Sequence, residues 1–292
     1  MRDISAANLE AFTQRLGTMR PKLHRYCARM TGSVVDGEDV VQDAMIKALE
    51  AFPGEAEIAN VEAWVFRIAH NCALDLLRKR SRQQAWLIEA PAEDIADPQA
   101  DTEHRVATAA SLKSFMRLPP VRRAAVILMD VLGYSLQEIA AVLDVSVASV
   151  KASLHRGRLQ LLQLRTEGPP LLPAMNAHEL EQLSAYVDRF NAHDFDAIRM
   201  LLAEDVKLDL ANRAHSQGRE KVGRYFSNYA GRDDWRLAAG FADGRPAVLV
   251  YEAAEAPAYF ALIEWADGKI VHITDFRYAR YAMDGAEAMP RA

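Results

Sequence analysis

Two different spacings of hydrophobic residues divide the chain near residue 176. Before this point, apolar residues recur every three or four positions, which is typical of amphipathic helices. Residues 176–206 continue as two helices. After them, β-branched and aromatic residues alternate with polar ones at 207–210, 247–253 and 258–281, as in strands. The pattern predicts an all-α part followed by an α+β part.

Two strong helical patterns fill the first part. The segment 38–52 has an apolar stripe, made of Val40, Val41, Ala44, Met45, Ala48, Leu49 and Phe52. Acidic residues gather at its start, where the helix dipole favours negative charge, and "PGE" at 53–55 ends it. The next helix starts after Asn60, a suitable N-cap, and finishes in the basic run Arg78, Lys79, Arg80 and Arg82.

The stretch "SLQEIAAVLDVSVASVKASLHRGR", residues 135–158, predicts two short helices that meet at a tight corner. Asp144 at the corner tolerates the left-handed conformation, and Ser146 can cap the second helix. The expected inner face is Ile139, Leu143, Val150 and Leu154. The expected outer side is Ala148, Ser149, Lys151, Ala152, Ser153, His155, Arg156 and Arg158. Small and basic side chains favour a helix-turn-helix that binds DNA, although an ordinary helical hairpin in a core remains open.

Charge and proline content separate the segments further. Residues 83–104 hold six acidic residues and no Lys or Arg, whereas residues 105–165 hold nine basic and three acidic residues. Three prolines interrupt residues 166–175, which predicts a second linker. The first 168 residues are neutral in sum, so the net charge of −5 belongs to residues 169–292. Such local changes of sign suggest different partners for different segments.

Several classes of protein are disfavoured by composition. The two cysteines, Cys27 and Cys72, lie in helical patterns without metal-ligand spacing, so we expect buried reduced thiols and no metal. No apolar run approaches the ~20 residues of a membrane span. The first residues lack the apolar core of a signal peptide. We therefore expect a cytoplasmic protein without membrane contact.

Three segments in order carry a family resemblance. They are "DGEDVVQDAMIKALEAF" (36–52), "NVEAWVFRIAHNCALDLLRKRSR" (60–82) and "LPPVRRAAVILMDVLGYSLQEIAAVLDVSVASVKASLHRGR" (118–158). Together they resemble the extracytoplasmic-function (ECF) sigma factors of bacterial RNA polymerase. The resemblance implies two all-α sigma domains, region two at 8–82 and the helix-turn-helix region four at 105–165. It implies core RNA polymerase and promoter DNA as partners, and no cofactor.

The resemblance also assigns roles to residues. The polymerase-binding residues would be Asp39, Val40, Gln42 and Asp43. The residues that open the minus-ten promoter element would include His70, Asn71, Arg78, Lys79 and Arg80. The residues that hold the minus-thirty-five element would include Ser149, Lys151, Ser153, Arg156 and Arg158. Many family members have Arg where this chain has Ser153, and Ala where it has Gly157. We therefore expect these two positions to make its promoter choice differ from that of its relatives. Glycine also weakens a helix by ~1 kcal/mol relative to alanine.

Residues 176–283 resemble the SnoaL-like fold, a cone formed by helices and a curved sheet. In some sigma factors such a domain docks on the sigma domains and tunes them, so a separate anti-sigma factor would not be required. The acid–base candidates are His193, Asp194, Asp209, His215, His272 and Asp275. We expect Asp194 to cap a helix, and we expect no catalytic residue. The alternatives are a SnoaL-like isomerase or hydrolase, a ligand sensor with a DNA-targeting part, and a helix-turn-helix repressor that needs no polymerase.

Overall fold

The computed structural model describes residues 6–53, 58–84, 111–165, 175–229, 231, 234–286 and 288–290. The chain divides into two compact units, residues 1–169 and 170–292, which we call the helical unit and the sheet unit. The predicted linkers lie almost entirely outside the described residues. Among the described helices, none combines the length and apolar character needed to cross a membrane.

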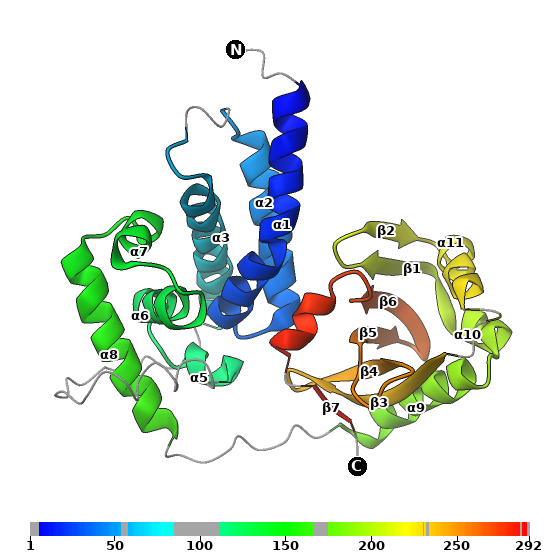
Figure 1. The fold of residues 1–292 in the computed structure, drawn as a ribbon. Helices are drawn as coiled ribbons and strands as arrows, with labels where there is room; N and C mark the ends of the chain where they lie inside the picture. The colour runs from blue at the N-terminus through cyan, green and yellow to red at the C-terminus, as the bar shows by residue number, and fades with distance from the viewer. Residues whose placement is uncertain are drawn as a thin grey trace. The chain divides into compact units, whose positions relative to one another are not determined.

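Three long helices form the first half of the helical unit: α1 (Ala6–Thr31), α2 (Val34–Glu50) and α3 (Val61–Gln84) (Figure 1). The predicted stripe of α2 is confirmed, because Val40, Val41, Ala44, Ala48 and Phe52 are buried. Asn60 caps α3 as predicted, since its side-chain oxygen accepts a hydrogen bond from the Ala63 amide at 3.0 Å.

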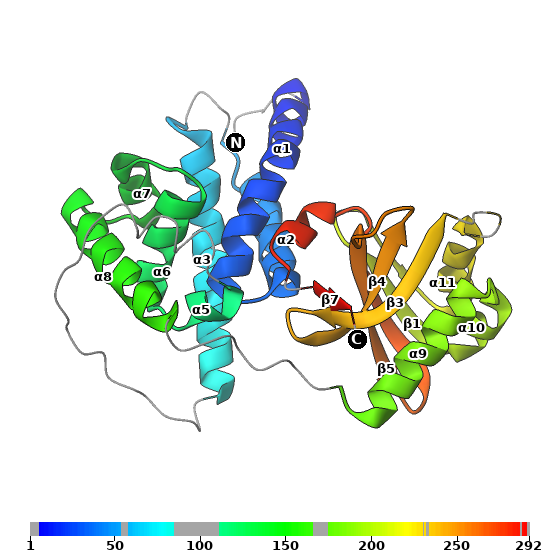
Figure 2. The same ribbon diagram turned by 60° about the horizontal axis from the view of Figure 1, so that its bottom comes forward.

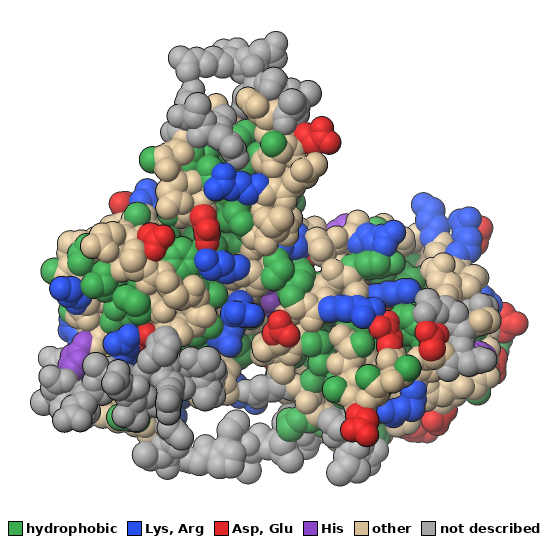
Figure 3. Space-filling model, in the orientation of Figure 1, with side chains coloured by type: hydrophobic (Ala, Val, Ile, Leu, Met, Phe, Trp, Pro, Cys, Tyr) green, Lys and Arg blue, Asp and Glu red, His purple; other side chains and the backbone are tan. Residues whose placement is uncertain are grey.

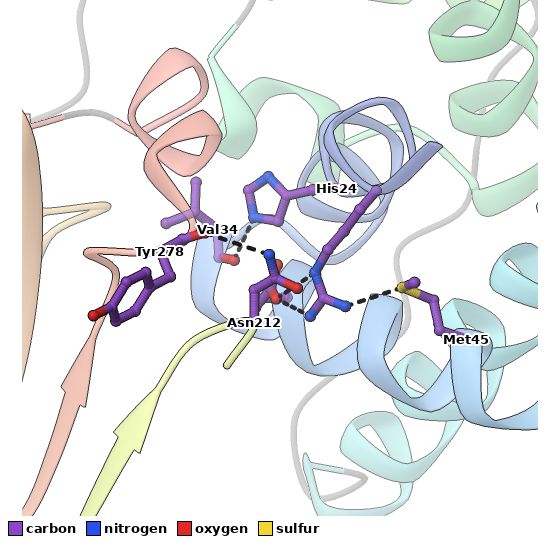
Figure 4. Close-up of polar contacts among 7 residues, drawn as sticks. His24, Val34, Met45, Asn212 and Tyr278 are labelled. Carbon is purple, nitrogen blue, oxygen red and sulfur yellow. Dashed lines mark hydrogen bonds and ion pairs between the residues drawn. The ribbon is translucent and has the colours of Figure 1, made fainter. Parts of the chain in front are cut away.

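A buried polar cluster joins α1 to α2. The Nε of Arg20 donates to the Glu38 carboxylate at 3.1 Å, and both residues are less than a tenth exposed. Beside them, His24 Nε2 lies 2.8 Å from the Val34 carbonyl (Figure 4). Burial lowers the pKa of His24, although Glu38 and the carbonyl act in the opposite direction. Arg20 and Glu38 are therefore two opposite charges buried away from water, and each is stabilised by the other.

The second half of the helical unit contains α5 (Leu112–Met116), α6 (Pro120–Val126), the π-helical turn η2 (Ile127–Val131), α7 (Leu136–Leu143) and α8 (Val147–Arg165). The predicted corner is confirmed: Asp144 has a φ of 57°, and Ser146 accepts from the Ser149 amide at 3.2 Å. One hydrophobic cluster runs from Phe12 to Leu161, so both halves share a core.

The sheet unit begins with α9 (Ala177–Asn191) and α10 (Phe195–Leu201), followed by β1 (Leu202–Leu210) and β2 (Ala214–Gln217). Next come α11 (Arg219–Tyr225) and the short helix η3 (Phe226–Asn228). The strands β3 (Trp235–Ala242), β4 (Arg245–Glu252), β5 (Tyr259–Ala266) and β6 (Lys269–Asp275) precede η4 (Arg280–Asp284) and β7 (Ala288–Pro290). Asp267 and Gly268 form the hairpin turn between β5 and β6, and both have positive φ, as Asp-Gly turns require.

The strands form one curved sheet in the order β2-β1-β6-β5-β4-β3-β7, in which only the described pairing of β1 with β6 is parallel. Helix α9 lies along the concave side of the sheet (Figure 2). Aromatic rings fill this side: Phe190 is 5.1 Å from Tyr229, and Tyr229 is 5.0 Å from Trp235, measured between ring centroids. These rings occupy one part of the interior of the cone, while a pocket of about 760 Å³ lies beside them, lined by residues of α9, β4 and β5.

Candidate nucleic-acid interface

Helix α3 has one exposed stripe that ends in basic residues. It is formed by Arg67, Asn71, Asp75, Arg78 and Arg82, which follow the helical period along one side. Of the predicted residues, Asn71, Arg78 and Lys79 are exposed, while Arg80 is half-buried and pairs with Asp36 at 2.5 Å. Arg67 was absent from the prediction, although the helical spacing from Asn71 could have revealed it.

The prediction that His70 contacts DNA is wrong. Its side chain points into the helical core, where only 6% of the residue is exposed. Its Nδ1 lies 2.7 Å from the hydroxyl of Tyr26, a residue 44 positions earlier in the chain. Burial, helped by the nearby Arg78, lowers the pKa of His70 to about 4. The Tyr26 hydroxyl thus gives His70 a polar partner inside the core. This partner explains why His70 is buried, although its neighbours in the sequence suggested an exposed position.

Acid is expected to destabilise the helical unit through His70. Its pKa is about 4 in the folded chain, against 6.5 for a histidine in water, so between these values the unfolded chain binds one more proton. Stability should fall as pH decreases from ~6.5 to ~4, by up to about 3 kcal/mol for this group. Urea unfolding at several pH values measures the slope. His70→Gln should flatten it, while His178→Gln, at an exposed position of α9, should not.

Fewer residues are exposed on the outer side of α8 than the sequence predicted. Ser149, Lys151 and Arg156 are exposed. Ser153 is only 9% exposed and lies on the inner side, so its predicted contact with bases is wrong. Arg158 donates from Nε to Asp130 at 2.9 Å, and its NH2 lies 2.5 Å from the other carboxylate oxygen. This two-bond pair ties α8 to η2 and turns Arg158 away from the predicted role.

Helix α2 presents a second candidate surface. Asp39 and Asp43 are exposed and Gln42 is half-buried, so these three can meet a partner. Val40 is only 3% exposed and belongs to the core, so its predicted contact is wrong. Ile46 is 47% exposed one turn after Gln42 and was missed by the sequence analysis. The surface therefore combines carboxylates with one apolar side chain.

A groove of 370 Å³ opens beside the start of α3. Its lining includes Ile58, Asn60, Trp64 and Arg67 from the first half of the helical unit, and Ala141 from the second. Trp64 packs 6.2 Å from Phe12, measured between ring centroids, so one part of it joins the core while another part lines the groove. An aromatic ring, an amide and a guanidinium in one groove suit a planar base.

Comparisons with known proteins place these surfaces in a family. Residues 17–83 match Sigma-70 region 2, residues 112–161 match Sigma-70, region 4, and residues 183–273 match the SnoaL-like domain. The ECF RNA polymerase sigma factor SigG of Mycobacterium tuberculosis is 27% identical, over 91% of this chain and 80% of its own length. SigM of the same organism is 34% identical, over 54% of this chain and 79% of its own length. The chain belongs to the ECF RNA polymerase sigma factors.

Membership of this family makes the chain a sigma initiation factor with a SnoaL-like domain. A solved structure of M. tuberculosis SigJ, an ECF sigma factor, covers 90% of this chain and 95% of its own at 22% identity, with a TM-score of 0.37. Region two of the sigma factor contains α1–α3, and region four contains α5–α8.

Gly157 of the sigma factor lies where α8 packs against α6. A Cβ there would lie 2.7 Å from a methyl carbon of Val126 and 3.3 Å from the Arg122 carbonyl oxygen, so α6 and α8 touch at this glycine. Its position facing α6 argues against a direct part in promoter choice.

We expect Gly157→Ala to destabilise the sigma factor by about 1 kcal/mol despite the better helix propensity of alanine, because overpacking outweighs it. Thermal unfolding tests this. Val126→Ala removes the clashing methyl group, so Gly157→Ala should cost less in a Val126→Ala background than in the unaltered chain. A more stable Gly157→Ala protein would contradict the argument.

The acid–base candidates of the SnoaL-like domain do not form a single cluster. Asp194 caps α10, as expected, by accepting from the Ala197 amide at 3.0 Å. On β1, Asp209 contacts His215 at 2.7 Å and His272 at 2.6 Å. Burial opposes ionisation of Asp209, but these hydrogen bonds outweigh it and lower its pKa.

Asp275 lies apart from that group and is buried. It accepts hydrogen bonds from the Tyr225 hydroxyl and, at 2.7 Å, from the Arg277 amide. Burial raises the pKa of Asp275, although both hydrogen bonds oppose the rise. The Tyr225 hydroxyl also forms a hydrogen bond with the Tyr229 hydroxyl, with 2.5 Å between the two oxygens. The carboxylate is thus engaged by side chains and backbone of its own domain.

Proposed function

We propose that three exposed faces of the helical unit direct core RNA polymerase to promoters. Asp39, Gln42 and Asp43 on α2 bind the polymerase, with Ile46 as an apolar addition. The stripe of α3 opens the minus-ten element, and the outer side of α8 holds the minus-thirty-five element. The observation that carries the proposal is that these faces are exposed on helices whose opposite sides share one core.

The capture of single-stranded bases is assigned to α3 and its groove. Aromatic rings stack on unpaired bases, and Arg or Lys tracks the strand. The half-buried Trp64 ring, the Arg67 guanidinium and the Asn60 amide line the groove, and Arg78 and Lys79 continue the basic surface along the helix. Region two can therefore offer both a place for a base and a path for the phosphates.

The role of α8 is tested by removing its exposed cations. Lys151→Ala should weaken binding to all promoters and reduce the salt dependence of binding by about one counterion. Arg156→Ala should cost about 1–3 kcal/mol if Arg156 contacts a base edge, and should relax selectivity at that base pair. Lys221→Ala removes one exposed cation from the sheet unit and serves as the control. Equal affinities for all three variants would contradict the role of α8.

Binding to polymerase and initiation are tested together. The full chain and core polymerase should initiate in vitro transcription on promoters enriched by binding. Asp43→Lys should reduce copurification with polymerase, because the surface that it alters is exposed and acidic. Asp196→Lys reverses an exposed charge in the sheet unit and is the matched control. Absence of initiation from every promoter, with or without residues 170–292, would overturn the function.

For the SnoaL-like domain we propose a regulatory role without catalysis, exerted on the sigma domains and without a separate anti-sigma factor. Its net negative charge and the net positive charge of residues 105–165 support an intramolecular contact. Figure 3 shows acidic and basic side chains mixed over its visible face.

Residues 1–168 and the full chain should be titrated against polymerase and assayed for initiation. Different affinities or activities are expected. Identical values for both proteins would contradict regulation by the SnoaL-like domain.

A further inference from the structure

Strands β4 and β5 pair with each other along only part of their lengths. Their described pairing joins residues 248–250 to residues 259–261 and stops there. In the same register, the next residue directed across the ladder would be Pro246, opposite Ile263. Pro246 still pairs with β3 on its other side, and Ile263 still pairs with β6. The sheet is therefore split between the start of β4 and the end of β5.

The proline explains why the pairing stops. The Val250 carbonyl accepts a hydrogen bond at 2.7 Å from the amide of Ala258, just before β5, so the backbone groups of Val250 are directed to β5. Because these directions alternate along a strand, the backbone groups of Pro246 are directed to β5 as well, and those of Ile263 are directed to β4. Proline has no N–H to donate to the Ile263 carbonyl. The Ile263 carbonyl therefore faces the split without a donor from β4.

A pocket of about 760 Å³ lies at this split, and we call it the β4–β5 pocket. Its apolar lining includes Pro246 from β4, and Leu262, Ile263 and the half-buried Trp265 from β5. Leu183 of α9, which belongs to the core of the sheet unit, lines it from the other side. Pockets of about 300–1,000 Å³ with apolar walls hold small organic molecules. An aromatic ring suits the indole of Trp265, because flat rings stack or meet edge to face.

The charged groups of the β4–β5 pocket favour a cationic ligand. Among its described lining residues, the carboxylates are Glu179, Glu264 and Asp267, and the only guanidinium is Arg245. Glu179 is engaged in capping α9, where it accepts from the Asn176 amide at 3.1 Å. Glu264 and Asp267 are exposed, and Arg245 lies 3.9 Å from Glu264, beyond hydrogen-bond distance. An ammonium group can therefore reach two carboxylates.

We propose that the β4–β5 pocket binds a small aromatic amine. The ring of the amine packs against Trp265, and its ammonium group meets Glu264 and Asp267. The ammonium group also supplies the N–H that Pro246 lacks and can donate it to the Ile263 carbonyl. An ammonium group beside an indole gains further attraction from the ring. The site lies within the sheet unit, so the inference goes beyond the proposed function and does not depend on it.

The first test uses 2-phenylethylamine, which carries one ring and one primary ammonium group. Isothermal titration calorimetry with the full chain should give a Kd of about 1 mM or lower, as expected for a small fragment. The matched control ligand is 3-phenylpropanoate, which has a similar shape and the opposite charge. It should bind at least about tenfold more weakly. Equal or tighter binding of the carboxylate would overturn the choice of an amine, and absence of binding by both ligands would overturn the site.

The position of the ammonium group is tested by removing charge without changing size. Glu264→Gln and Asp267→Asn each remove one carboxylate, and asparagine tolerates the positive φ of residue 267. Each variant should weaken binding of 2-phenylethylamine about threefold. Asp205→Asn removes an exposed carboxylate of β1 outside the pocket lining and should leave binding unchanged. Pocket variants that bind as tightly as Asp205→Asn would contradict the assigned position.

The split itself is tested by Pro246→Val. Valine restores an N–H opposite the Ile263 carbonyl and favours strand structure, so the pairing of β4 with β5 should extend and the pocket should narrow. Binding of 2-phenylethylamine should fall at least about tenfold, while thermal unfolding shows equal or higher stability. Unchanged binding by the folded variant would overturn the place of the site. Glu264→Gln, at an exposed position, keeps the test decisive if Pro246→Val does not fold.

Discussion

Replacing Glu38 by alanine is expected to lower the free energy of unfolding of the helical unit by about 3–5 kcal/mol. The variant leaves the Arg20 guanidinium, now only 7% exposed, without its carboxylate. A buried charge that loses its partner keeps the cost of desolvation, and this cost is larger than the value of the pair itself. Urea unfolding measures the loss, and hydrogen exchange in α1 and α2 assigns it to the helical unit.

Two control variants test whether the loss comes from burial of the Arg20 charge. Asp75→Ala breaks the ion pair with Arg78, in which both side chains are more than 60% exposed, and should change stability by no more than about 1 kcal/mol. Replacing both buried partners, as in Arg20→Met with Glu38→Leu, should recover most of the loss, because no charge then remains buried. A loss below about 1 kcal/mol for Glu38→Ala would show that water reaches the pair.

Gly37→Ala is the second substitution with a large expected effect, a loss of about 2 kcal/mol in the free energy of unfolding. A Cβ at Gly37 would lie 2.6 Å from the backbone nitrogen of Ala28 and 2.7 Å from its Cα, so the backbones of α1 and α2 meet there. Backbone cannot rotate aside as a side chain does, and the helices must move apart. The gain in helix propensity, about 1 kcal/mol, is too small to offset this.

Gly17→Ala provides the matched control within α1. It makes the same change inside a helix, where a Cβ would meet nothing within 4 Å. This variant should gain up to about 1 kcal/mol of stability from helix propensity. Thermal unfolding compares the two variants, which should shift the melting temperature in opposite directions. A shift in the same direction would mean that packing at Gly37 is not limiting.

Much of the fold followed from local rules that act within a few residues. The stripe of α2, the caps at Asn60 and Ser146, and the left-handed Asp144 were predicted because helical periodicity and capping depend on near neighbours. The Asp267–Gly268 turn follows from the same kind of local rule. The segments that match Sigma-70 regions 2 and 4 were found from the sequence, since their residue types and order suffice for the resemblance.

Single residues at the borders of these faces were placed less well. His70, Ser153 and Val40 were assigned to partners but lie in the core, while Arg67 and Ile46 were overlooked. Polarity alone suggests an exposed position for His70, until a partner such as the Tyr26 hydroxyl makes burial acceptable. That partner lies on another helix, so sequence spacing could not reveal it.

The sequence by itself determined which segments form helices and strands, where they begin and turn, and the family to which they are similar. The tertiary structure decided which polar residues are buried, how closely α1 meets α2, and how region four contacts region two through Arg67 and Glu62. The physical reason is range. Propensity, capping and periodicity act over one or two turns, whereas burial and ion pairing depend on contacts between residues far apart along the chain.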